Sequence, residues 1–135
     1  MGQAILANEL PGIKVQSAGV GALIGYPADP LATQLMADRG LDISNHRARQ
    51  VTDVACRQAD LILVMDLQQK RILETKYPFV RGKLFRFAES EKKDVPDPFK
   101  KSRTEFEDAL ALIEGGALTW IERIKKISAK EQQFI

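Results

Sequence analysis

The sequence predicts an α/β layered fold with a parallel sheet. Helix-like and strand-like patterns alternate along the chain, which is typical of helices that connect parallel strands through right-handed crossovers. The run LILVM at 61–65 is continuously apolar and has acids at both ends, as expected of a strand buried on both faces. A single apolar stripe near the C-terminus indicates one long helix that covers the sheet.

The N-terminal part is expected to contain two helices separated by a strand and a long loop. Residues 2–10 favour a short helix that a Pro-Gly pair ends. Residues 13–19 begin with alternating apolar and polar side chains and run into a glycine-rich stretch, so a strand followed by a loop is predicted. Asp29 as N-cap and Pro30 at the first helical position predict the second helix, which Gly40 ends.

The remaining chain is expected to continue the alternation. Helices are predicted over about 52–58 and 67–76, and a strand over 83–88. Ser102 and Glu105 fit a capping box ahead of the last helix. Its apolar side chains recur at alternating steps of four and three, at Phe106, Leu110, Ile113, Ala117, Trp120, Ile124 and Ile127. No strand precedes the first helix, although the βαβ pattern would place one there.

Composition restricts the class of protein. A chain of 135 residues fits one domain, spanning 1–135, with a modest core. The net charge of +2, with acids and bases interspersed, gives no electrostatic case for binding nucleic acid or a membrane. No apolar run reaches transmembrane length, so membrane insertion is not expected. Cys56 is the single cysteine, which excludes an intrachain disulfide and favours a cytoplasmic location.

Five ordered segments resemble the low-molecular-weight protein tyrosine phosphatases, most closely the bacterial type associated with exopolysaccharide and capsule synthesis. These segments are SAGVGALIGYPADP (17–30), HRARQVTD (46–53), ADLILVMD (59–66), RGKLF (81–85) and VPDPFKKSR (95–103). The resemblance implies a flavodoxin-like, three-layer fold with strand order 2-1-3-4. It also implies hydrolysis of phosphotyrosine through a phosphocysteine, with no cofactor and no metal.

The family's catalytic loop, of pattern C-x5-R-S/T, is absent from this sequence. In the family the cysteine attacks phosphorus, the arginine grips the phosphate oxygens, and a separate aspartate protonates the leaving tyrosine oxygen. Cys56 is followed six residues later by Ile62, so Cys56 is interpreted as a small core residue. The chain is therefore expected to begin just after the loop and the central strand, and to be catalytically inactive.

The resemblance assigns roles to five residues. Asp97, between two prolines that stiffen its backbone, corresponds to the general acid. Phe99, where the family usually has tyrosine, and Leu23 correspond to walls against which the substrate ring packs, although ordinary loop packing would also explain Phe99. His46 and Ser17 correspond to residues that support the phosphate loop; without that loop, a purely structural histidine is expected.

The sequence leaves three functions and two structural outcomes open. The first function is phosphatase of a phosphotyrosine protein, such as a bacterial tyrosine autokinase of polysaccharide export. The second is a non-catalytic remnant that binds a partner or assembles. Arsenate reductase fits least, because its chemistry needs further cysteines. Without a central strand, the remaining strands are expected to close up, or copies to associate as a homo-oligomer through unpaired or swapped strand edges.

Overall fold

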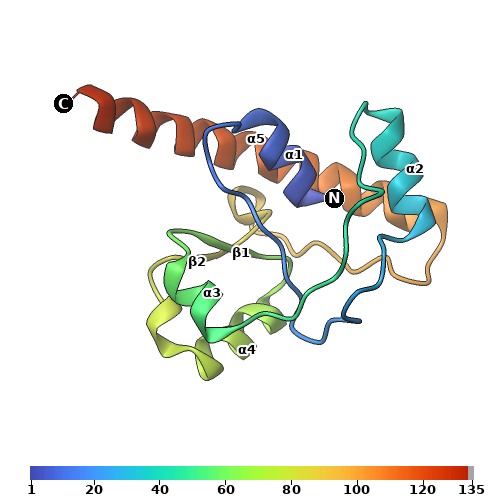
Figure 1. The fold of residues 1–135 in the computed structure, drawn as a ribbon, viewed down its shortest axis with the longest axis horizontal. Helices are drawn as coiled ribbons and strands as arrows, with labels where there is room; N and C mark the ends of the chain where they lie inside the picture. Colours follow the sequence, from blue (N-terminus) through green and yellow to red (C-terminus); the bar gives the residue numbers. More distant parts are fainter. Residues whose placement is uncertain (134–135) are drawn as a thin grey trace.

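The computed structural model describes the backbone of residues 1–133 and the side chains of residues 1–127. Figure 1 shows the long helix α5 lying across one side of the sheet, with α1 and α2 beside it and α3 and α4 on the other side. In chain order the elements are α1 (Gly2–Glu9), α2 (Pro30–Asp38), α3 (Asp53–Gln58), β1 (Ile62–Val64), α4 (Leu67–Lys76), η1 (Pro78–Val80), β2 (Leu84–Arg86), η2 (Glu89–Glu91) and α5 (Arg103–Gln133).

The two strands β1 and β2 form a parallel sheet, as predicted, and α4 lies in the crossover between them. Ile62 pairs with Leu84 in the register of this sheet. The N–H of Ile62 donates to the carbonyl of Lys83 at 2.8 Å, and the N–H of Phe87 donates to the carbonyl of Val64 at 2.6 Å. Both strands are shorter than the predicted ranges.

The strand predicted over 13–19 is not formed, so this prediction was wrong. A strand requires a ladder of backbone hydrogen bonds to a neighbouring strand. Within residues 1–133, the β-pairing of this segment is limited to an isolated bridge between Gly19 and Gln50. The remaining strands were expected to close up, but 13–19 does not pair with β1. In the described chain the edge of β1 opposite β2 therefore has no strand partner.

Side chains alternate between the two faces of the sheet, which gives the predicted three layers. Leu63 packs against a buried cluster formed with α1 and α5, which includes Phe87 of the chain following β2. Val64 belongs to a second cluster on the other face, which contains Leu84, Leu73 of α4 and Cys56 of α3. The site described below lies at the carboxyl end of this sheet.

Carboxylate side chains cap the starts of α2 and α4, of which the first was predicted. The Asp29 carboxylate accepts from the N–H of Leu31 at 2.8 Å, with Pro30 at the first helical position. The Asp66 carboxylate accepts from the N–H of Gln69 at 2.7 Å and begins α4. Gly40 follows α2 with a φ of +75°, a conformation that glycine adopts without strain.

Helix α5 buries the predicted stripe only along its first part. Phe106, Leu110 and Trp120 are buried, whereas Ile127 is 59% exposed because the helix has passed the end of the core. The predicted capping box is half formed. The N–H of Glu105 donates to Ser102 Oγ at 3.4 Å, which is the first bond of such a box. In a full box the Glu105 carboxylate would accept from the backbone N–H of Ser102, whereas here it accepts from the Ser102 hydroxyl at 3.5 Å.

Candidate active site

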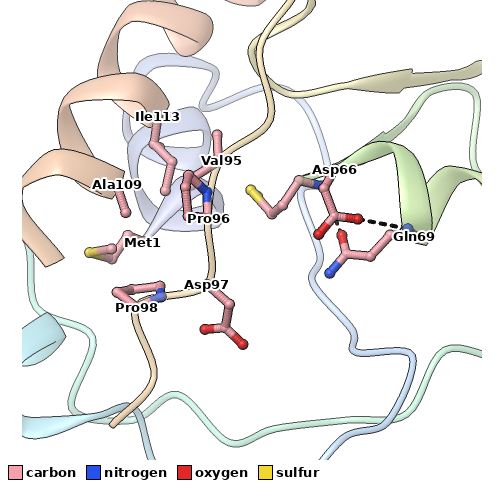
Figure 2. Close-up of a pocket in the computed structure, with 11 residues that line it drawn as sticks. Met1, Asp66, Gln69, Val95, Pro96, Asp97, Pro98, Ala109 and Ile113 are labelled. Carbon is pink, nitrogen blue, oxygen red and sulfur yellow. Dashed lines mark hydrogen bonds between the residues drawn. The ribbon is translucent and has the colours of Figure 1, made fainter. Parts of the chain in front are cut away.

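A cavity of about 260 Å³ opens at the carboxyl end of β1 (Figure 2). Asp66 and Gln69 lie on one side, and the apolar side chains of Met1, Ala109 and Ile113 lie on the other. The segment 95–98 crosses between them and carries Asp97. Ligand sites of parallel α/β sheets commonly lie outside the carboxyl ends of strands, so the position itself favours a site.

The segment that carries Asp97 is fixed to the end of β1. The N–H of Val95 donates to the carbonyl of Met65 at 2.8 Å, and the Val95 side chain is only 2% exposed. Just before it, Asp94 Oδ1 accepts from the guanidinium of Arg86 at 3.1 Å and from the N–H of Leu67 at 3.2 Å. Strand β2, strand β1 and helix α4 therefore all anchor this segment.

Asp97 itself lies exposed at the rim of the cavity, with its carboxylate directed toward the open side in Figure 2. Its Oδ1 accepts from the N–H of Phe99 at 3.0 Å, which forms a local turn after Pro98. This bond occupies Oδ1 and not the second carboxylate oxygen. A carboxyl group held in this manner suits general acid–base chemistry.

Asp66 and Gln69 share the cavity and were missed as site residues in the sequence. Asp66 caps α4, and Gln69 Oε1 accepts from the N–H of Met65 at 2.8 Å, so both side chains are held in place (Figure 2). The available signal was their position directly after a buried parallel strand. Asp66 was visible in the sequence only as the acid that ends an apolar run.

Ser17 and His46 lie outside the set that lines this cavity. The Ser17 hydroxyl donates to Gln3 Oε1 at 2.7 Å, and Gln3 Nε2 donates to the carbonyl of Val15 at 3.2 Å, which ties α1 to the segment before Gly19. His46 is half-buried, and its pKa is lowered first by burial and then by the positive charges of the N-terminus and neighbouring arginines. Their support of a phosphate loop stays a prediction.

Leu23 and Phe99 are both accessible for contact with a ligand. Leu23 is 51% exposed and Phe99 is 48% exposed, and neither lines the cavity itself. The ammonium of Lys100 lies 5.4 Å from the centre of the Phe99 ring. Their predicted role as substrate walls also stays a prediction, since two exposed apolar side chains fit several kinds of contact.

Cys56 lies in the core, away from the cavity, as the sequence predicted. Its side chain is 3% exposed and packs in the cluster of Val64 and Tyr77. Burial raises the pKa of its thiol, which disfavours the reactive thiolate. Among the residues that line the cavity there is neither a cysteine nor an arginine. The lining therefore includes carboxyl groups that could transfer a proton, but no cysteine that could attack phosphorus.

Comparison with known proteins decides the family. Residues 1–131 match the low molecular weight phosphotyrosine protein phosphatase family. This chain belongs to that family. It is 50% identical over 127 residues to the probable low molecular weight protein-tyrosine-phosphatase EpsP of Ralstonia solanacearum, which covers 94% of this chain and 88% of the relative. It is 37% identical over 123 residues to the phosphatase Wzb of Escherichia coli K12, with 90% and 84% covered. The predicted family and its exopolysaccharide-associated type are confirmed.

Solved structures of low molecular weight phosphatases share the fold. Vibrio vulnificus Wzb in complex with benzylphosphonate matches with a TM-score of 0.86 and 37% identity, over 90% of this chain and 87% of that one. The YwlE arginine phosphatase from Geobacillus stearothermophilus matches with a TM-score of 0.88 and 25% identity, over 96% and 86%. The helices and strands thus keep the family arrangement. None of the helices in the described part of the chain is both long and apolar enough to cross a bilayer.

Proposed function

We propose that this domain serves phosphotyrosine hydrolysis and that Asp97 is its general acid and base. The observation that carries the proposal is the bond from Val95 to Met65, which holds the Asp97 segment over the end of β1. In this role Asp97 donates a proton to the tyrosine oxygen as the phosphorus–oxygen bond breaks. It then takes a proton from the water that attacks the phosphocysteine.

A protein phosphotyrosine is the proposed substrate. The 50% identical relative is named a protein-tyrosine-phosphatase, whereas the neighbour named an arginine phosphatase is only 25% identical. The exposed side chains of Leu23 and Phe99 would pack against the two faces of the tyrosine ring. We propose a cytoplasmic tyrosine autokinase of polysaccharide export as the phosphoprotein, in keeping with the relatives of the exopolysaccharide type.

The 135 residues alone are proposed to be inactive toward phosphate esters. They contain one cysteine, which is buried in the core, and no arginine six positions after it. Without a thiolate there is no phosphocysteine, and without the bidentate arginine the phosphate charge is not neutralised. Asp97 alone could not complete the reaction, because a leaving tyrosine oxygen forms only when a thiolate attacks the phosphorus.

The role of Asp97 is tested by adding the nucleophilic cysteine and the phosphate-binding arginine to the chain. A chimera that joins the family's strand and C-x5-R loop to the start of this chain should hydrolyse p-nitrophenyl and phenyl phosphate. In the chimera, Asp97→Asn should lower kcat for the poorer phenol leaving group by about 10²-fold or more, because that group depends on proton donation. Asp66→Asn is the matched control from the same cavity. It should leave the ratio of kcat for p-nitrophenyl phosphate to kcat for phenyl phosphate unchanged. Equal rates for the Asp97→Asn chimera and its parent would contradict the assignment.

A second candidate function is non-catalytic binding or assembly. One observation favours it: within residues 1–133, the edge of β1 that faces away from β2 has no strand beside it. Unpaired edges of this kind bind extended segments of other chains. Size-exclusion chromatography with light scattering tests assembly, and a monomer at all protein concentrations would exclude the homo-oligomer.

A further inference from the structure

The guanidinium of Arg86 joins the two ends of the turn that leads from β2 to the Asp97 segment. Arg86 Nε donates to Glu89 Oε2 at 3.0 Å, at the start of η2. Arg86 Nη1 donates to Asp94 Oδ1 at 3.1 Å, where the turn ends. The Arg86 side chain is only 12% exposed, so these ion pairs are screened less by solvent than pairs between fully exposed side chains. Arg86 therefore restrains the point at which the chain leaves this turn.

The turn between these two bonds contains a backbone conformation that needs support. Lys92, directly after η2, has a φ of +53°, in the left-handed region that residues other than glycine rarely adopt. Such a conformation costs free energy and persists only where the surrounding structure holds it. The N–H of Lys92 donates to the carbonyl of Glu89 at 2.9 Å. The N–H of Lys93 donates to the carbonyl of Ala88 at 3.2 Å. The two bonds of Arg86 add a side-chain restraint to these backbone bonds.

Asp94 connects this restraint to the end of β1. Its Oδ1 also accepts from the N–H of Leu67 at 3.2 Å, at the first residue of α4. The next residue, Val95, donates its N–H to the carbonyl of Met65 at 2.8 Å. Without Arg86, the exposed Asp94 carboxylate would keep its bond from Leu67 but could turn toward solvent. The bond between Val95 and Met65 would then lose support from the residue before it.

Two prolines make the link from Asp94 to Asp97 stiff. Pro96 and Pro98 each fix their own φ, and each restricts the residue before it to extended conformations. Those preceding residues are Val95 and Asp97. A displacement at Asp94 is thus transmitted to the carboxyl group of Asp97, because few backbone torsions between them can absorb it.

We propose that Arg86 is a positioning residue for Asp97. Through Asp94, it keeps the carboxyl group of Asp97 where a leaving oxygen can take its proton. Arg86 lies outside the set that lines the cavity, so it acts without touching the substrate. This inference rests on the proposed function, in which Asp97 is the general acid. A general acid must lie within hydrogen-bond reach of the oxygen that it protonates, so a displacement of about 1 Å is enough to slow the reaction.

Amide hydrogen exchange of the full 135-residue chain, resolved by NMR, tests the restraint itself. In Arg86→Leu, the Val95 amide should exchange about tenfold faster relative to the Ile62 amide, because hydrogen bonds to charged groups shift local equilibria by this much. The Ile62 amide is bonded within the sheet and reports any change in global stability. Arg39→Leu is the matched control: it removes another arginine–carboxylate bond, of 3.0 Å to Glu114, and should leave the ratio unchanged.

Asp94→Ala shows whether Arg86 acts through Asp94. This variant removes the acceptor for both Arg86 and Leu67, so Val95 exchange relative to Ile62 should rise at least as far as in Arg86→Leu. The double variant should match Asp94→Ala alone. Effects of the two substitutions that add in full would overturn the proposed route. An unchanged ratio of Val95 to Ile62 exchange in Arg86→Leu would overturn the restraint itself.

The consequence for the reaction is measured in the chimera that carries the family's strand and loop. Arg86→Leu should lower kcat for phenyl phosphate by about tenfold and kcat for p-nitrophenyl phosphate by less than about twofold, because the poorer leaving group depends on the proton. Arg39→Leu should leave both kcat values unchanged. Equal losses for the two substrates in Arg86→Leu would indicate a purely structural role and overturn the inference. If Asp97→Asn changes the ratio of the two kcat values and Arg86→Leu does not, the inference fails while the proposed function stands. If neither variant changes the ratio, both fail.

Discussion

The indole N–H of Trp120 donates to the backbone carbonyl of Phe87 at 2.9 Å, and this bond joins helix α5 to the chain that leaves β2. The Trp120 ring also lies 5.5 Å from that of Phe85, centre to centre. One turn earlier, Gly116 lies directly over the same Phe87 carbonyl. The close approach of α5 places Ala109 and Ile113 against the cavity that contains Asp97.

Gly116→Ala should destabilise the protein, because the added methyl group would collide with the Phe87 backbone. Overpacking of this kind costs about 1–3 kcal/mol of unfolding free energy, which exceeds the helix propensity gained from alanine. Gly115→Ala is the matched control: its methyl group would meet only the end of the flexible Glu91 side chain. Urea unfolding followed by Trp120 fluorescence measures both. Equal stability of the two variants would show that α5 does not approach Phe87 so closely.

Lys83→Met should weaken the attachment of α3 to the sheet. The Lys83 ammonium donates to the carbonyls of Cys56 and Ala59, each at 2.7 Å, and so satisfies the C-terminal end of a short helix. Methionine keeps the apolar stem and removes the donors, which should cost about 1–3 kcal/mol. Lys14→Met, at an exposed loop position, is the control and should change the unfolding free energy by about 0.5 kcal/mol or less. A loss of the same size in both variants would contradict the capping role.

The sequence predicted most elements because local signals and tertiary packing agree. Asp29, Thr52 and Asp66 each cap the helix that was expected after them. The strand at 13–19 was mispredicted. Alternating apolar and polar side chains indicate a half-exposed segment, but a strand also needs a neighbouring strand to bond to, which this pattern does not reveal. Asp97 was identified through the family resemblance. Gln69 was not, because its place at the cavity depends on a hydrogen bond to Met65 that no sequence pattern indicates.

The stability of the fold should fall as pH decreases below 6.5, in part through His46. Its folded pKa is lowered from 6.5, so the unfolded chain binds a proton first and stability is lost as pH falls toward the folded pKa. His46→Asn should remove this part of the dependence. The check is the difference in unfolding free energy between pH 7.5 and pH 5.5, measured for both proteins. An equal or larger loss in His46→Asn would contradict the assignment. The lowered pKa of the Met1 amine acts in the same direction and is common to both.

Asp97→Asn should preserve the local fold and Asp97→Ala should loosen it. Asparagine retains an oxygen that accepts from the N–H of Phe99, whereas alanine leaves that donor to water. We expect a stability near wild type for asparagine and a loss of about 0.5–1.5 kcal/mol for alanine. Limited proteolysis near Lys100 and Lys101 should be faster only in the alanine variant. Equal cleavage of both variants would mean that the turn does not order the segment.

The most direct test of whether the site lacks a nucleophile is the hydrolysis of p-nitrophenyl phosphate by the pure 135-residue chain. No turnover above that of buffer is expected, because the cavity holds Asp97 without a thiolate or an arginine. The variants Asp97→Asn and Cys56→Ser should be indistinguishable from the parent. Enzyme-dependent turnover that persists in the Asp97→Asn, Cys56→Ser double variant would contradict this account of the site.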